Sequence, residues 1–82
     1  MRYTVISPPL AEEELALYWF HASDRDAITK ASHQIDLILQ RDPFSGQRQN
    51  DCFVLTVSPL TVTYHVSPDD LRVTIRQYLY HG

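Results

Sequence analysis

The last strand-like segment of the chain carries most of the side chains that could do chemistry. In the run from Leu71 to Tyr80, the two-residue period of a strand separates apolar from polar side chains. One face is then Leu71, Val73, Ile75 and Leu79, and the other is Arg72, Thr74, Arg76, Tyr78 and Tyr80. Guanidinium groups can hold a phosphate, and phenol rings can stack on bases. The pattern predicts a sheet with one face packed on helices and the other open to a charged, planar ligand such as RNA.

Cleavage of RNA by its own 2′-hydroxyl also needs groups that take and return a proton. His81 follows the last strand, His65 lies in the strand before it, and imidazole changes protonation near neutral pH. Tyr78 or Tyr80 could act as an acid or as a stacking platform, and Arg76 as the phosphate clamp. These five residues are the candidate catalytic set. Each also has an ordinary interpretation, because exposed arginines are usually solvated and aromatic residues at strand ends usually pack.

Size and composition set limits on the protein. Its 82 residues predict one domain, residues 1–82, with an ordinary globular content of 44% hydrophobic and 21% charged residues. The net charge of −3 argues against a general nucleic-acid binder. Seven of the ten acids precede Phe44, however, so a local basic site on the last strand is compatible with an acidic body.

Cysteine content and hydropathy predict the cellular setting. Cys52 is the single cysteine, so no internal disulfide and no Cys/His zinc spacing can form, and we expect no metal and no organic cofactor. The first residues are too short an apolar run for a signal peptide, and no segment approaches the roughly 20 apolar residues that cross a bilayer. The sequence predicts a cytoplasmic protein without membrane contact.

The first half of the chain predicts one strand and a helical hairpin. Tyr3–Ile6 is rich in strand formers, and a helix beginning near Pro8 follows. Its expected buried stripe is Ala11, Leu15, Tyr18, Trp19 and Ala22. A capping signal at Ser23–Asp26 begins a second helix to about Gln40, whose apolar side is Ile28, Ala31, Ile35, Ile38 and Leu39. The short connection predicts that the helices pack antiparallel.

The second half predicts a polar loop and a three-stranded meander. The loop runs from Phe44 to Asp51, and the strands are 53–57, 60–66 and 71–80. In the middle strand, Leu60, Val62, Tyr64 and Val66 share one face, while His65 shares the other with Thr61 and Thr63. The fold class is therefore α+β in the order β-α-α-β-β-β, with the helical hairpin packed on a twisted, mainly antiparallel sheet.

Several segments at the joints of this layout are similar to those of a known family. They are the opening 3–8, Leu15 and Trp19 of the first helix, the run 35–39, the joint 42–46 and the strand 59–66. On these segments the chain resembles the RelE/ParE superfamily of small toxins from bacterial type II toxin-antitoxin systems. The resemblance covers nearly the whole chain and is specific in layout rather than in any one motif.

The resemblance implies two kinds of activity. RelE-like members cleave messenger RNA on the ribosome without a metal, whereas ParE-like members poison DNA gyrase, and both are held inactive by a partner antitoxin. Members often place basic residues that contact RNA in the loop before the meander, which here contains Arg48, with Arg41 nearby. Together with Arg72 these are the candidate RNA-binding residues. For the antitoxin, an apolar contact surface of Leu10, Leu17 and Tyr18 is expected.

Two features of this sequence differ from the family pattern. Ribosome-dependent members end in a His-Tyr pair, and here the order is reversed in Tyr80-His81. Many members carry an arginine near the start of the meander, where this chain has Cys52-Phe53-Val54. We therefore expect ribosome-dependent mRNA cleavage, with the ribosome and mRNA as partners. The missing arginine favours the alternative, a non-catalytic binding module that inhibits gyrase or only binds its antitoxin.

Overall fold

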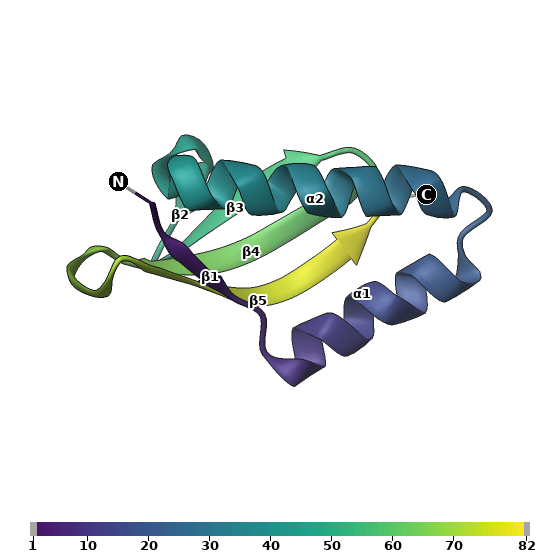
Figure 1. The fold of residues 1–82 in the computed structure, drawn as a ribbon, viewed down its shortest axis with the longest axis horizontal. Coiled ribbons are helices and arrows are strands. Elements are labelled where there is room, and N and C mark those ends of the chain that lie inside the picture. Colours follow the sequence, from purple (N-terminus) through teal and green to yellow (C-terminus); the bar gives the residue numbers. More distant parts are fainter. Residues whose placement is uncertain (1, 82) are drawn as a thin grey trace.

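The computed structural model describes residues 2–81 and shows two helices packed on one face of a five-stranded mixed sheet (Figure 1). The elements in chain order are β1 (Thr4–Ile6), α1 (Pro9–His21), α2 (Arg25–Arg41), the 3₁₀ turn η1 (Pro43–Ser45), β2 (Gln47–Gln49), β3 (Cys52–Val57), β4 (Leu60–Ser67), the 3₁₀ turn η2 (Pro68–Asp70) and β5 (Arg72–Tyr80). The sheet order is β1-β5-β4-β3-β2, with only the β1–β5 pair parallel. The predicted α+β class and helical hairpin are confirmed.

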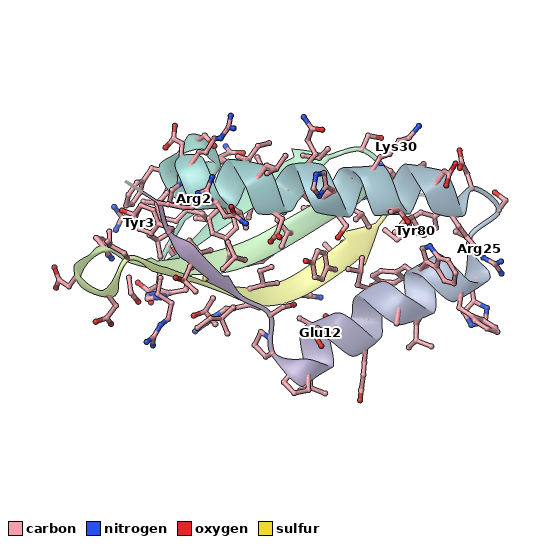
Figure 2. The ribbon with its side chains drawn as sticks, in the orientation of Figure 1. Arg2, Tyr3, Glu12, Arg25, Lys30 and Tyr80 are labelled. Atoms are coloured by element: carbon pink, nitrogen blue, oxygen red, sulfur yellow. The ribbon has the colours of Figure 1, made fainter. Side chains whose placement is uncertain are left out.

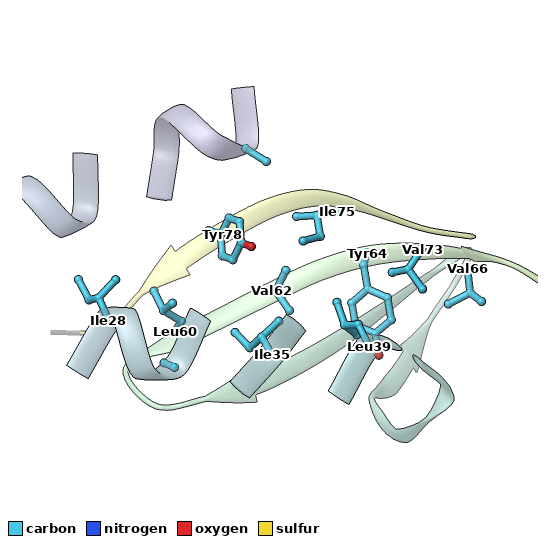
Figure 3. Close-up of a cluster of buried hydrophobic side chains, with 12 residues drawn as sticks. Ile28, Ile35, Leu39, Leu60, Val62, Tyr64, Val66, Val73, Ile75 and Tyr78 are labelled. Atoms are coloured by element: carbon cyan, nitrogen blue, oxygen red, sulfur yellow. The ribbon is translucent and has the colours of Figure 1, made fainter. Parts of the chain in front are cut away.

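The core lies between α2 and the centre of the sheet (Figure 3). The inward side of β4 alternates as predicted, and Leu60, Val62, Tyr64 and Val66 are all buried. From α2, Ile28, Ala31, Ile35 and Leu39 meet them, because spacings of three and four residues put these side chains on one side of the helix. The Asp24 carboxylate accepts a hydrogen bond from the Ala27 backbone N–H (3.1 Å), so the predicted cap of α2 is confirmed.

The prediction of a loop at residues 44–51 is wrong, because part of this segment is a strand. β2 pairs antiparallel with β3, and the tight turn between them contains Asn50, whose φ of 55° lies in the left-handed region that asparagine tolerates. All three β2 residues are exposed. An edge strand with no buried side chain has no hydrophobic alternation, so its sequence reads as a loop.

The expected alternation along the last strand is wrong in its second half, because β5 carries a β-bulge. Thr63 pairs with Gln77 and Tyr64 pairs with Ile75, so Arg76 is an extra residue in the ladder. Arg76 and Gln77 are both exposed, and beyond them the two faces of the strand are exchanged. The bulge therefore explains why the residues that follow it lie on faces opposite to those predicted.

The residues after the bulge show this exchange. Tyr78 is buried with 4% of its surface exposed, and Tyr80 is half-buried and stacked on Tyr18 of α1, with ring centroids 5.8 Å apart. Leu79, expected in the core, is 41% exposed. Tyr78 and Tyr80 therefore face the helices, not the open face of the sheet.

Deletion of Gln77 is expected to remove the bulge and restore a regular ladder with Arg76 opposite Thr63. Because every inward residue keeps its partner, the free energy of unfolding should change by no more than about 1 kcal/mol. Deletion of Leu79 is the control, since it would turn Tyr80 outward and away from Tyr18. Urea denaturation followed by circular dichroism compares the two. A loss as large for the Gln77 deletion as for the Leu79 deletion would contradict this register.

Helix α1 covers the edge of β5 that β1 leaves unpaired. β1 pairs only with residues 72–74, and at Tyr78 side chains of α1 take the place of a strand. The Tyr78 backbone N–H donates to Glu14 Oε1 (3.4 Å), and its carbonyl accepts from the Tyr18 hydroxyl (3.0 Å). These contacts satisfy backbone groups at an exposed edge.

Apolar residues occur on every side of α1, so its buried stripe is only partly as predicted. Ala11 is buried and Leu15, Tyr18 and Ala22 pack against the core, whereas Trp19 is 42% exposed. Leu10 and Leu17 are exposed, while Tyr18 points to the sheet. The three residues predicted as an antitoxin surface therefore do not form one face.

Candidate functional site

A hollow of about 420 Å³ lies where β4 and β5 extend past the start of β3. Its lining residues are Phe44, Arg48, Asp51, Phe53, His65, Val66, Pro68 and Arg76. They come from η1, β2, β3, β4 and β5 and from the turns that join them. The hollow is therefore assembled from segments up to 32 residues apart in sequence, and its chemistry depends on the sheet register.

Two cations and an imidazole line this hollow. Arg76 projects from the bulge of β5, His65 from the outward side of β4, and Arg48 from the edge strand β2. Both arginines are exposed and His65 is half-buried, so all three remain accessible to a ligand. Arg48 is oriented by donating from Nε to the Asn50 carbonyl (3.4 Å). Such a group can bind a phosphate and take up a proton.

The bulge gives Arg76 its position. In a regular strand, one residue occupies the place opposite Thr63, whereas here Arg76 and Gln77 share it and both face outward. Bulges recur beside functional sites because they redirect a side chain without ending the sheet. The local departure from strand geometry thus falls at the candidate phosphate-binding residue.

Aromatic residues that the sequence interpretation missed form one wall of the hollow. Phe44 is 49% exposed and lies edge-on to both Tyr3 and Phe53, with ring centroids 6.2 and 5.6 Å apart. Phe53 in turn stacks on the buried Tyr64 at 5.8 Å. Phe44 is thus a supported ring with an accessible surface, suited to stacking on a base. The only signal for it in sequence is its place in the Pro-Phe-Ser-Gly joint, at residues 43–46.

The joint that carries Phe44 is held by Tyr64. The Tyr64 hydroxyl donates to the Pro43 carbonyl (2.6 Å), and Ser45 closes the turn with bonds from its N–H (3.2 Å) and Oγ (2.8 Å) to the Asp42 carbonyl. A Cβ on Gly46 would lie against the Tyr64 hydroxyl and 2.8 Å from the Val54 carbonyl oxygen. A glycine is therefore needed for this close approach.

Three predicted catalytic residues lie away from the hollow. Tyr78 is buried under the helices, and burial, foremost, together with Asp36 and Glu12, raises its pKa despite an opposing hydrogen bond with Ser7. The hydroxyl of Tyr78 therefore resists ionisation and its ring is inaccessible. The prediction that Tyr78 stacks on a base is wrong. Tyr80 packs on Tyr18 and does not line the hollow.

His81 lies at the other end of the sheet. Its Nε2 and the Thr61 Oγ1 are 2.5 Å apart, and Thr61 is 3.0 Å from the Thr56 hydroxyl. Five residues of extended chain separate His81 from Arg76, about 16 Å along the strand. His81 does not line the hollow that contains Arg76, so the structure does not bring these two predicted catalytic residues together.

Two further predicted RNA-binding residues also lie outside the hollow. Arg41 ends α2, and Arg72 begins β5 between Thr4 and Ser67; both are exposed. Neither lines the hollow. Within residues 2–81, no set of three or more His, Cys, Asp or Glu side chains is placed to hold a metal ion. No helix in that range is long and apolar enough to span a bilayer.

Comparison with known proteins supports the fold. No protein-family model matches the sequence, and no curated protein matches it significantly. Among solved structures, the chain is similar to one in the toxin-antitoxin complex RelBE2 from Mycobacterium tuberculosis, with a TM-score of 0.78, 15% identity, and coverage of 98% of this chain and 92% of that one.

Two structures of the E. coli toxin RelE are also similar. A mutant in the free state has a TM-score of 0.69 at 13% identity, covering 95% of this chain and 82% of that one. The isolated toxin has a TM-score of 0.58 at 14% identity, covering 98% and 85%. The chain therefore has the fold of the RelE toxins, as the sequence resemblance implied.

Proposed function

We propose that this chain is the toxin subunit of a type II toxin-antitoxin pair and cleaves messenger RNA on the ribosome. The observation that carries the proposal is the convergence of Arg48, His65 and Arg76 in one hollow beside the exposed ring of Phe44. The shared fold with RelE toxins agrees with it.

The proposed reaction uses three side chains of this hollow. Arg48 and Arg76 hold the phosphate and stabilise the negative charge that develops on its oxygens. His65 accepts the proton of the 2′-hydroxyl, whose oxygen attacks phosphorus while the bond to the 5′-oxygen breaks. The leaving oxygen takes a proton from water, giving a cyclic 2′,3′-phosphate and a 5′-hydroxyl. Phe44 stacks on a base and fixes the scissile bond over the arginines.

Cell-free bacterial translation with the purified chain tests this reaction. Primer extension should show new mRNA ends that require ribosomes. Arg76→Ala should reduce their rate of formation by about 10²–10³-fold, since it removes a donor to the developing charge. Arg72→Ala is the matched control, because it removes an arginine of the same strand outside the hollow and should leave cleavage unchanged. No cleavage by folded protein, or equal losses in both variants, would refute the reaction.

A second candidate function is a non-catalytic binding module, either a gyrase inhibitor or a chain that only binds its antitoxin. β3 begins with Cys52 and Phe53 and supplies no cation, and Asp51 places a carboxylate among the residues of the hollow. A DNA gyrase supercoiling assay distinguishes the two functions. Inhibition of supercoiling without mRNA cleavage would favour the module.

A further inference from the structure

Another hollow, of about 350 Å³, lies between the outer side of α1 and the bulge of β5. On the helix it is lined by Leu10, Glu13, Glu14 and Leu17, which have the spacing of one helix face. On the strand it is lined by Arg76 and Gln77, the two outward residues of the bulge. Arg76 also lines the candidate site, so the two hollows meet at this side chain. We call this hollow the outer groove.

The outer groove has apolar side chains that the rest of the chain leaves uncovered. Leu10 is 76% exposed and Leu17 is 58% exposed. On β5, the exposed Leu79 lies on the same outward side of the strand as Gln77. Side chains project from α1 on the side turned away from α2, where no other element of residues 2–81 lies (Figure 2). Single leucines on a surface are common, but two that line one groove, with a third along the adjoining strand, are typical of a contact surface.

The charged groups of the outer groove are balanced, with one free carboxylate for one guanidinium. Glu14 is half-buried and its Oε1 accepts the Tyr78 backbone N–H (3.4 Å), so this carboxylate is engaged within the chain. Glu13 and Arg76 are exposed and lie on opposite walls of the groove, one on α1 and one on β5. A two-fold axis along the groove would place each wall opposite the other wall of a second copy. The outer groove is therefore complementary to itself in charge.

We propose that two copies of this chain associate through their outer grooves, around a two-fold axis along the groove. The α1 helix of each copy then lies over β5 of the other, and Glu13 of one copy pairs with Arg76 of the other. Leu10 and Leu17 leave water against the second copy. A contact limited to these elements is at the lower end of specific interfaces, about 1,200 Å² in total. Because each copy also has a net charge of −3, the association is weak and depends on concentration.

The association has a consequence for the candidate site, because it covers Arg76. A guanidinium that pairs with a carboxylate of another copy cannot hold a phosphate of RNA at the same time. The dimer is therefore inactive, and the monomer is the form that cleaves. This consequence rests on the proposed function, whereas the association itself does not.

Sedimentation equilibrium of the purified chain measures the association without RNA. We expect a reversible monomer–dimer equilibrium with a dissociation constant between about 10 µM and about 1 mM. Glu13→Arg and Arg76→Glu should each weaken it about tenfold, because like charges then face each other in both symmetry-related pairs. An equimolar mixture of the two variants should associate as tightly as the original chain, because mixing restores both pairs between copies. Mixing would not restore a pair formed within one chain.

Two further variants locate the contact on α1. Leu17→Gln should weaken the association about 100-fold, because it removes a leucine from each copy while keeping good helix propensity. Glu12→Arg is the matched control and should not weaken it, because Glu12 lines a different hollow, on the side of α1 that faces α2. Circular dichroism checks that each variant is folded. A monomer at every concentration, unchanged association of Leu17→Gln, or a mixture no tighter than either charge variant alone would overturn the proposal.

The consequence for activity has a separate readout. In cell-free translation, the rate of mRNA cleavage per chain should fall as the original chain is concentrated beyond its dissociation constant, and it should stay constant for Leu17→Gln. An equal fall in both would refute inhibition by the dimer. Absence of cleavage at every concentration would refute the proposed reaction, and the sedimentation result would still decide the association.

Discussion

Replacement of Gly46 by alanine is expected to lower the free energy of unfolding by about 2–3 kcal/mol, a large part of the roughly 5 kcal/mol that holds a domain of this size folded. The added methyl group would lie against the Tyr64 hydroxyl and the Val54 carbonyl. Both are fixed, one by its bond to the Pro43 carbonyl and the other by its place in β3. The joint must therefore move, and Phe44 with it.

Thermal and urea unfolding of two further variants separate this clash from the loss of the hydrogen bond. Tyr64→Phe removes the hydroxyl and should cost about 1–3 kcal/mol, because the buried Pro43 carbonyl loses its donor. The double variant with Gly46→Ala should cost less than the sum, since one of the two clashing atoms is gone. Gln47→Ala, at an exposed residue of the edge strand β2, is the control. Additive losses would show that Gly46 and Tyr64 do not interact.

This joint shows what local sequence could and could not predict. A proline followed by a glycine three residues later predicts a turn, and the turn is present as η1. The need for glycine arises from Tyr64, eighteen residues away, and no local pattern contains that contact. The apolar spacing of α2 and the alternation of β4 predicted the buried side chains correctly. Each of these patterns repeats along a single buried face of its own element, so a local segment contains all of the signal.

The errors in the last strand have one physical cause. Strict alternation gives the right faces from Arg72 to Ile75, and the extra residue at Arg76 exchanges them for every later position. Nothing in the sequence around Arg76 marks the bulge. Alternation therefore gave the outward positions of Arg76 on β5 and His65 on β4, while Tyr78 and Tyr80, beyond the bulge, were placed on the wrong face. Phe44 was missed because its neighbours come from other strands.

The folded chain is also expected to lose stability as the pH rises above about 10, the ordinary pKa of tyrosine. Two buried phenols are responsible. Burial is the main reason that the pKa of Tyr64 is raised; a backbone hydrogen bond at Gly46 opposes the shift and Asp42 adds to it. Burial likewise raises the pKa of Tyr78 most, and Asp36 adds to it. Above pH 10 the unfolded chain therefore binds fewer protons than the folded one, so unfolding becomes easier as pH rises.

The stabilisation that comes from keeping Tyr64 and Tyr78 protonated is complete below the pKa of tyrosine in the unfolded chain. It is lost as the pH rises through the pKa values of the two phenols in the folded chain. Each pKa unit between the two states corresponds to about 1.4 kcal/mol, which makes the alkaline limit of this small domain steep. Urea unfolding at intervals from about pH 8 to about pH 11 measures the slope. Tyr78→Phe should flatten the slope, because the phenol that resists ionisation is gone. An identical slope in the original chain and the Tyr78→Phe variant would assign the alkaline transition to other groups.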